Sequence, residues 1–396
     1  MTSPFESGKP ILKKLNEAGF EAYFVGGAVR DFLLDRKIGD IDIATSAKPE
    51  EVKMIFPKTV DVGIEHGTVL VIYKGRGYEV TTFRKESEYE DYRRPKSVVF
   101  ISSLEEDLKR RDFTMNAIAM DLDGKIYDPF NGKGDLERKM IRCVGTPSER
   151  FMEDALRMMR AIRFQSQLGF QIDKETYDSL EQLSPLLEKI AVERIYIEWS
   201  KLLGGQHKLN AFHALIDTGL VHRLPASEEL SRGIQDFLKF EGNALKTEEA
   251  WLLLLHKSGI ISPYDVLKKW KTPKALQKEL HSLLIWLNYR MKNPWTDYDL
   301  YQAGINKALS VERVFNCMFG RELSASTQLL RTLYNKLPIH HREELAINGK
   351  DLLDWTNRTP GPWMKEWIGN IEKAVIEGRM PNKKEAIREW FFNEFT

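Results

Sequence analysis

Residues 24–45, FVGGAVRDFLLDRKIGDIDIAT, carry the pattern that decides the fold of this 396-residue chain. An apolar run ends in Gly26 and Gly27, a short helical pattern follows, and a second apolar run carries Asp40 and Asp42, each followed by an isoleucine. Because side chains alternate between the two faces of a strand, both carboxylates are expected on one face and both isoleucines on the other. The pattern therefore predicts a strand, a helix and a second strand on which two carboxylates converge.

The residue types in this stretch fit a site for a phosphate group and a hard cation. Glycines allow backbone N–H groups to approach a triphosphate at a helix N-terminus, and Arg30, one turn into the helix, adds positive charge. Two converging carboxylates are suitable ligands for a hard divalent cation. A lone Asp-x-Asp pair is a weak signal, which the nearby glycines and Arg30 strengthen.

Composition places the chain among ordinary globular proteins, with enough residues for about two to four domains. The net charge is +1, so a nucleic-acid partner would have to be held by local basic patches. Two cysteines, Cys143 and Cys317, exclude a disulfide framework and fit buried thiols in a reducing cytosol. No signal-peptide pattern or bilayer-length apolar run is present, so we expect a cytoplasmic protein without a membrane partner.

The rest of the first 145 residues mixes helix and strand patterns. Residues 10–19 form an amphipathic helix pattern that ends at Gly19, and Pro49 begins another short helix. Residues 68–73 and 78–83 predict a β-hairpin. These patterns predict a mixed sheet with helices.

Glu79 lies on the second strand of this hairpin. If that strand borders the one that carries Asp40, Glu79 could be a third acidic group at the metal site. The pattern is equally typical of a strand carboxylate that simply faces solvent. Residues 84–97, RKESEYEDYRRPKS, are charged and interrupted by Pro95, which predicts a mobile loop that projects from the sheet.

Two arginines and an aspartate, Arg110, Arg111 and Asp112, precede an apolar strand pattern at residues 117–122. Guanidinium groups of this kind pair well with phosphates. An exposed helix end would explain the same cluster.

Residues 147–170, PSERFMEDALRMMRAIRFQSQLGF, predict one amphipathic helix whose apolar stripe faces the core. Polar residues recur at every third position along it. They are Asp154, Arg157, Arg160 and Arg163. Arginines with a single carboxylate at this spacing could bind a planar base and its phosphates, whereas a salt-bridged, solvated face is the alternative.

Beyond Gly169 helical patterns dominate, without a strict repeat. The predicted helices cover residues 190–203, 211–224, 248–256, 263–270, 273–291 and 381–392. The fold class is therefore α+β, in which a mixed N-terminal part precedes an all-helical remainder. The eight histidines form no HExxH pattern, so a metal-dependent hydrolase site in the helical half is not indicated.

Six motifs in fixed order give the chain a family resemblance. They are VGGAVRD at 25–31, GDIDIAT at 39–45, YEDYRRP at 89–95, RRDFTMNAIA at 110–119, EDALRMMRAIRF at 153–164 and ERIYIE at 193–198. Together they resemble the class II tRNA nucleotidyltransferases, the bacterial CCA-adding and poly(A) polymerase family of the polymerase-β-like superfamily. The resemblance implies a nucleotidyltransferase head and a helical neck, body and tail. The expected boundaries are 1–145, 146–205, 206–290 and 291–396.

The resemblance also implies roles for individual residues. Asp40 and Asp42 would be catalytic and would hold Mg2+ for two-metal nucleotidyl transfer. The residues that bind CTP and ATP would be Gly27, Arg30, Arg111, Asp154, Arg157, Arg160 and Arg163. Among these, Asp154 and Arg157 would face the incoming base, from the neck.

Elementary hydrogen-bond chemistry agrees with this last assignment. A carboxylate accepts from the exocyclic amine of cytosine or adenine, and an arginine donates to the adjacent ring nitrogen. Uracil and guanine present a carbonyl oxygen and a ring N–H at that edge, so the same pair rejects both. One Asp–Arg pair can therefore select CTP and ATP without a nucleic-acid template.

The implied function is template-independent addition of CCA to the 3′ end of tRNA, a step in tRNA processing and repair, with release of pyrophosphate. The rivals are a bacterial poly(A) polymerase, a CC-only nucleotidyltransferase, and a non-catalytic RNA-binding protein. The near-neutral charge argues against the first, the complete YEDYRRP motif against the second, and the intact Asp40 and Asp42 against the third. The acceptor stem of tRNA is the expected partner, and a helical tail could support a homodimer.

Overall fold

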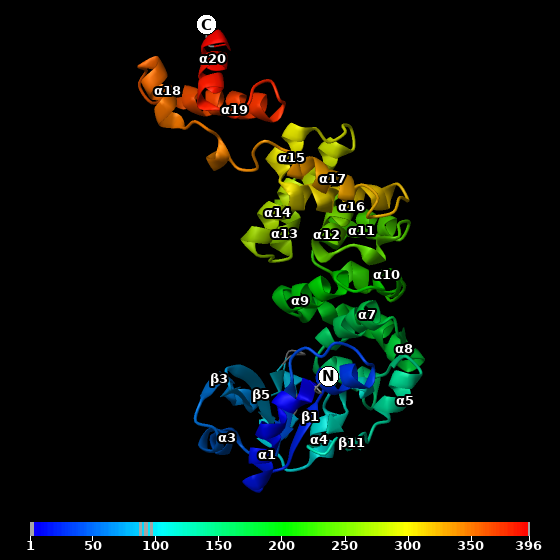
Figure 1. Ribbon diagram of the computed structural model, residues 1–396. Coiled ribbons are helices and arrows are strands. Elements are labelled where there is room, and N and C mark those ends of the chain that lie inside the picture. Colours follow the sequence, from blue (N-terminus) through cyan, green and yellow to red (C-terminus); the bar gives the residue numbers. More distant parts are fainter. Residues whose placement is uncertain (1–3, 87–88, 91–93, 96–97, 395–396) are drawn as a thin grey trace. The chain divides into compact units, whose positions relative to one another are not determined.

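The computed structural model describes residues 4–86, 89–90, 94–95 and 98–394. Its contacts divide the chain into two compact units (Figure 1). The first consists of Met1–Glu228 with Lys269–Lys271, and the second of Glu229–Lys268 with Thr272–Thr396. The division into head, neck, body and tail at the boundaries given above stays a prediction.

A seven-stranded mixed sheet forms the N-terminal part of the first unit. Its strand order is β11-β10-β1-β2-β5-β4-β3. The strands are β1 (Ala22–Val25), β2 (Asp42–Thr45), β3 (Thr59–Gly63), β4 (Thr68–Tyr73), β5 (Arg76–Thr82), β10 (Ala119–Met120) and β11 (Ile126–Tyr127). Strands β2 and β5 are parallel and the other neighbours antiparallel, so the predicted mixed sheet is confirmed.

The predicted hairpin is β4–β5, in which Tyr73 pairs with Arg76. The two residues between them, Lys74 and Gly75, both have positive φ, 47° and 77°. Such a turn matches the twist of the flanking strands, and glycine adopts the second position without strain. The hairpin therefore closes through two residues.

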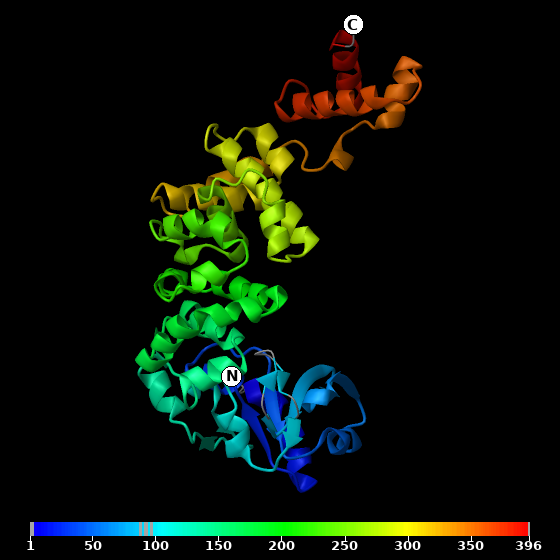
Figure 2. The same cartoon turned by 180° about the vertical axis from the view of Figure 1, so that it is seen from behind.

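Ten α-helices of the first unit belong to the described residues. They are α1 (Lys9–Glu17), α2 (Gly27–Leu33), α3 (Pro49–Ile55), α4 (Leu104–Lys109), α5 (Gly132–Glu137), α6 (Pro147–Glu153), α7 (Leu156–Leu168), α8 (Lys174–Leu183), α9 (Val192–Leu203) and α10 (Lys208–Asp217). Helix α7 packs against both α9 and α10, which the figures show on the side of α7 away from the sheet (Figures 1 and 2). This packing buries the apolar stripe predicted for residues 147–170; Met158, Met159 and Ile162 are fully buried.

The prediction of one continuous helix over residues 147–170 is wrong. The chain breaks at Asp154, whose backbone is extended at φ −140° and ψ 101°. The Asp154 carboxylate accepts the backbone N–H of Leu156 at 3.1 Å. Because short polar side chains compete with the backbone in this way, Asp154 favours the end of one helix and the start of the next.

The segment predicted as a mobile loop contains short strands where it is described. Strand β6 (Arg84–Glu86) pairs with β9 (Val98–Phe100), and β7 (Tyr89–Glu90) pairs with β8 (Arg94–Pro95). The predicted mobility falls partly on residues outside the described ranges and is not tested. The strand predicted at residues 117–122 is only the short β10, because a 3-10 turn at Thr114–Asn116 precedes it.

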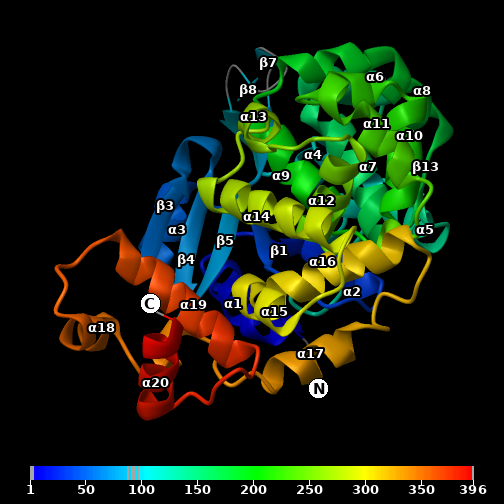
Figure 3. The ribbon, with the colours of Figure 1, turned by 90° about the horizontal axis from the view of Figure 1, so that it is seen from above.

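The second unit is helical throughout its described residues. Its helices are α11 (Ser227–Phe237), which begins two residues before the unit, α12 (Thr247–Lys257), α13 (Tyr264–Lys269), which ends at the boundary, α14 (Lys274–Arg290), α15 (Asp297–Ala303), α16 (Ile305–Met318), α17 (Thr327–Asn335), α18 (Gly349–Thr356), α19 (Pro362–Ile376) and α20 (Lys384–Glu394). Helix α14 packs against α12 and α16 (Figure 3). Trp355, Trp363 and Trp367 pack against the buried C-terminal cluster, as core residues do. No described helix has the length and apolar character needed to cross a bilayer.

Candidate functional site

A cavity of about 860 Å³ lies within the first unit, and all nine residues predicted for the site line it. Gly27, Arg30, Asp40 and Asp42 come from the β1–α2–β2 segment. Arg111 follows α4, Asp154 lies between α6 and α7, and Arg157, Arg160 and Arg163 project from α7. The structure thus brings together, from four segments, residues that are up to 136 positions apart, from Gly27 to Arg163.

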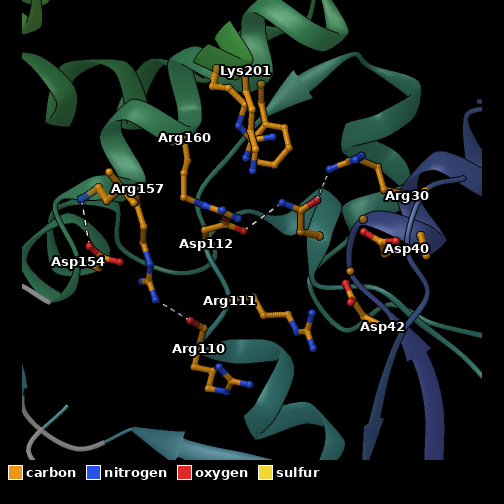
Figure 4. A pocket seen from close by; sticks show the side chains of 18 of the residues that line it. Arg30, Asp40, Asp42, Arg110, Arg111, Asp112, Asp154, Arg157, Arg160 and Lys201 are labelled. Carbon is orange, nitrogen blue, oxygen red and sulfur yellow. Dashed lines mark hydrogen bonds and ion pairs between the residues drawn. The ribbon is translucent and has the colours of Figure 1, made fainter. Parts of the chain in front are cut away.

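The two carboxylates lie at one side of the cavity, near Arg30 and Arg111 (Figure 4). The expectation that both would lie on one strand is wrong, because β2 begins at Asp42 and Asp40 precedes it in a bend. Ile43 is fully buried in the sheet, which directs Asp42 to the opposite face. Both carboxylates still line the cavity.

Burial and crowding of negative charge raise the pKa of Asp42 to about 6. Desolvation is the largest cause, the charge of Glu79 comes next, and Asp40 adds to it, while Arg111 opposes the shift. A carboxyl group that resists ionisation among other carboxylates is a favourable place for a bound cation, which would remove the repulsion. The residues present therefore fit a divalent metal ion.

Glu79 lies directly beside Asp42 in the parallel β2–β5 pair, so its strand does border the acidic strand. The side chain is exposed and is not part of the cavity lining. Within the described part of the chain, no group of three or more Asp, Glu, His or Cys residues is arranged to hold a metal ion. Glu79 contributes charge to the site, and a role as third ligand gains no support.

Arg30, one turn into α2, is held by several contacts. Its guanidinium group donates to Asp31 at 2.9 Å and to Asn116 at 2.8 Å, and lies over the ring of Phe164 at 5.1 Å. Gly26, which precedes the helix, has φ +68°, a conformation that other residues rarely adopt. A Cβ atom there would stand 3.1 Å from Arg111 Nη1. The glycine therefore makes room for a guanidinium group beside the carboxylates.

Arg111 is anchored through Asp107, a carboxylate that is 1% exposed. Arg111 Nη2 lies 3.2 Å from Asp107 Oδ2, and Arg110 Nη2 lies 2.7 Å from Oδ1. Arg111 Nε is buried and has no hydrogen-bond partner among the described residues. An unpaired buried donor of this kind is available to an anionic ligand.

Asp112 is a buried member of the site whose role the sequence left open between phosphate binding and an exposed helix end. It accepts from Arg160 Nε at 2.7 Å and from Asn116 Nδ2 at 3.1 Å. Burial raises the pKa of Asp112, but the charge of Arg160 and the hydrogen bonds from Asn116 and Arg160 outweigh it, so the net shift is downward. Since Asn116 also accepts from Arg30, a chain of hydrogen bonds joins α2 to α7 (Figure 4).

The arginines of α7 form ion pairs, as the alternative expected, but Arg157 and Arg163 are each 7% exposed, so their face is not a solvated one. Arg163 donates to the buried Glu198 at 2.8 Å and lies over the ring of Phe164 at 3.5 Å. Burial lowers the pKa of Arg163 to about 10; Glu198 opposes this shift and Arg160 reinforces it. The α7 face toward the cavity is thus cationic and rigid.

Asp154 and Arg157 lie at the opposite side of the cavity from Asp42 (Figure 4). Arg157 donates to Glu153 at 2.8 Å and to the backbone carbonyl of Arg110 at 2.9 Å. Asp154 pairs with Arg194 of α9, which the sequence reasoning gave no role. The only sequence signal for Arg194 is its place in the ERIYIE motif.

Family models match most of the chain. Residues 22–142 match "Poly A polymerase head domain", residues 169–230 match "Probable RNA and SrmB-binding site of polymerase A", and residues 244–391 match "tRNA nucleotidyltransferase domain 2". The chain is 47% identical to the CCA-adding enzyme of Bacillus mycoides over 387 residues, 98% of each chain. It is 48% identical to that of Geobacillus stearothermophilus over 393 residues, 98% of this chain and 97% of that enzyme.

Solved structures agree with these matches. The Bacillus stearothermophilus CCA-adding enzyme in complex with CTP has a TM-score of 0.90 and 45% identity, covering 100% of this chain and 98% of that one. The Thermotoga maritima CCA-adding enzyme complexed with tRNA has a TM-score of 0.63 and 22% identity, covering 100% and 97%, a similarity of fold.

Proposed function

This chain belongs to the CCA-adding enzymes, a family of tRNA nucleotidyltransferases, and from that premise we propose how its own residues carry out the reaction. The enzyme adds CCA to the 3′ end of tRNA from CTP and ATP, without a template, and releases pyrophosphate. One observation carries the proposal: a single cavity places carboxylates at one side and a potential base-reading Asp–Arg pair at the other, with arginines between them.

Asp40 and Asp42 hold the divalent metal ions that the family uses, and we propose that the metal is Mg2+. Oxygen ligands and the crowded negative charge around Asp42 support this choice. Mg2+ held by these two carboxylates would supply activation of the RNA 3′-hydroxyl and neutralisation of charge on the departing pyrophosphate.

The triphosphate is bound by Gly27, Arg30 and Arg111. Gly26, Gly27 and Ala28 at the start of α2 line the cavity together with Asp42, and a phosphate can approach the backbone N–H of Gly27 because that residue has no side chain. Arg30 and Arg111 are fixed by their carboxylate and amide partners, so their remaining N–H groups need little reordering when the phosphates arrive. These contacts position the α-phosphate for attack.

The base is read by Asp154 and Arg157, and Arg160 and Arg163 complete the nucleotide site. Asp154 accepts from the exocyclic amine of cytosine or adenine, and Arg157 donates to the neighbouring ring nitrogen. With uracil or guanine, the Asp154 carboxylate would face a carbonyl oxygen and the Arg157 guanidinium would face a ring N–H. Neither pair forms a hydrogen bond, so the wrong nucleotide binds more weakly. The same residues thus serve both correct nucleotides.

The helical half of the chain holds the tRNA, with phosphate contacts from lysines and arginines. We also propose that the reaction takes place in the cytoplasm; Cys143 and Cys317 are both buried, as suits thiols in a reducing compartment. A homodimer through the helical tail remains a proposal to be tested by light scattering.

The decisive experiment supplies labelled CTP and ATP, separately and together, to a tRNA transcript that lacks CCA, and resolves the products on a sequencing gel. Two residues from CTP alone and one more when ATP is added are the expected products. A long ladder from ATP alone would indicate a poly(A) polymerase, arrest after two residues a CC-only enzyme, and no product a non-catalytic protein. Asp42→Asn serves as the inactive control.

A further inference from the structure

Asp154 lies in a short break between two helices, where the backbone by itself does not fix the orientation of its side chain. It occupies the extended break between α6 and α7, and within the described ranges the neighbouring backbone gives its carboxylate one hydrogen bond, from the Leu156 N–H at 3.1 Å. A residue that reads a base by hydrogen bonding must hold its acceptor oxygen within a narrow range of positions. A second group is therefore needed to fix the carboxylate.

Arg194 is that group in the structure. Its Nη2 donates to Asp154 Oδ2 at 2.7 Å and its Nη1 to Oδ1 at 3.2 Å, a two-point contact across 40 residues of sequence. Planar guanidinium and carboxylate groups that meet at two points fix each other in orientation as well as in position. Both partners line the cavity.

The position of Arg194 in its own helix is unfavourable without this contact. It is the third residue of α9, where the helix dipole repels a cation. Helix α9 itself is held by its packing against α7, with Trp199 and Leu202 fully buried. It is therefore a fixed support from which Arg194 reaches Asp154.

The contact also leaves Asp154 with a defined hydrogen-bonding capacity. An ionised carboxylate accepts about four hydrogen bonds and donates none. Two are taken by Arg194 and one by the Leu156 N–H, which leaves about one acceptor position, enough for a single amine N–H of a base. A carboxylate held in this way offers no donor to the carbonyl oxygen of uracil or guanine.

We propose that Arg194 is a positioning residue that sets the specificity of the enzyme for C and A over U and G by holding Asp154 as a fixed acceptor. This inference rests on the proposed role of Asp154 in base reading. Arg194 acts through Asp154 and touches neither the base nor the reacting atoms.

The test measures kcat/KM for CTP and for UTP on one tRNA transcript that lacks CCA, in the wild type, Arg194→Met and Arg194→Lys. Because both nucleotides use the same RNA, effects on tRNA binding cancel in the CTP/UTP ratio. Arg194→Met is expected to lower this ratio by about ten- to hundredfold, the effect of losing a charged hydrogen-bond partner. Arg194→Lys keeps the charge without the planar two-point contact and should give an intermediate ratio. The ATP/GTP ratio on a transcript ending in CC should change in parallel.

A double-mutant cycle with Asp154→Asn tells whether Arg194 acts by positioning Asp154 or by contacting the nucleotide directly. If Arg194 acts through Asp154, Arg194→Met should change the CTP/UTP ratio of the Asp154→Asn enzyme by less than about twofold. An equal change in both backgrounds would mean that Arg194 contacts the nucleotide itself, and would overturn the proposal. So would an unchanged ratio in a folded Arg194→Met enzyme.

Arg223→Met is the matched control, because Arg223 also pairs with a carboxylate of the first unit, Glu188 at 2.6 Å, and does not line the cavity. It should leave the ratio unchanged. Thermal unfolding of each variant checks folding, and Arg194→Lys carries the test if Arg194→Met does not fold. A wild type that adds no CCA would refute the proposed function; a wild type that adds CCA with a ratio insensitive to Arg194 would refute only this inference.

Discussion

Removing the charge of Asp42 is expected to abolish activity and, at the same time, to stabilise the metal-free protein. The reason is that burial and the charge of Glu79 raise the pKa of Asp42 from 3.8 to about 6, so ionising this carboxyl group costs free energy in the folded state. Asp42→Asn keeps the shape of the side chain and removes that cost. A site residue is thus expected to lower stability in the absence of its ligand.

The size of the effect follows from the shift in pKa. The pKa of Asp42 rises from 3.8 to about 6, a shift of about two units. When Asp42 is fully ionised, this shift lowers the free energy of unfolding by about 3 kcal/mol. The pKa of Asp42 is higher in the folded state than in the unfolded state, so the folded protein binds the Asp42 proton more strongly. The loss of stability therefore appears as the pH rises and Asp42 ionises. It is complete above about pH 6 and falls to about 1 kcal/mol at pH 4.5.

The assay compares thermal unfolding of the wild type and Asp42→Asn in EDTA at pH 8 and pH 4.5. The variant should be more stable at pH 8 by roughly 1–3 kcal/mol, and the difference should shrink at the lower pH. Adding Mg2+ should raise the midpoint of the wild type and close the gap. Asp123→Asn, at an exposed carboxylate, is the control and should change nothing. A variant that is less stable than the wild type at pH 8 would refute the electrostatic argument.

Other features of the structure give further expectations. Glu153→Gln removes the ion pair that fixes Arg157, so kcat/KM for CTP should fall about tenfold in the gel assay; wild-type kinetics would show that Arg157 is fixed by its other contacts. Cys143 and Cys317 are buried, and burial raises the pKa of Cys143 to about 12, so a thiol reagent should label neither in the native protein and both after unfolding. The affinity for tRNA should fall steeply with salt in filter binding, and a flat response would contradict binding through phosphates.

Much of the acidic side of the site is predictable because its residues lie close together in the sequence. Gly26, Gly27, Asp40 and Asp42 belong to one strand–helix–strand segment, whose spacing already implies a shared location. The apolar stripe of α7 is predictable for a similar reason, since helical periodicity places its members on one face. Family resemblance supplied the proposed roles of the site residues, and the structure places all of them around one cavity.

The contacts that fix these residues were not predictable, because they join segments far apart in the chain. Arg194 meets Asp154 across 40 positions, and Asn116 meets Arg30 across 86. Periodicity describes one element at a time and carries no information on which elements will be neighbours. The break at Asp154 was missed for a related reason, since an unbroken apolar pattern continues through it while the aspartate redirects the backbone locally.

The hydrogen-bond chain from Arg30 through Asn116 and Asp112 to Arg160 is better explained by the orientation that it gives these side chains than by a gain in folding stability. A buried ion pair such as Asp112–Arg160 must overcome a large desolvation cost, and apolar residues of the same volume often give a protein of equal or greater stability. What apolar residues cannot provide is orientation: the Asn116 carbonyl accepts from Arg30 while its amide donates to Asp112, so each group sets the direction of the next. The α2 and α7 residues for which we propose phosphate and nucleotide binding therefore belong to one hydrogen-bonded network, and on that proposal a nucleotide meets side chains that are already in place.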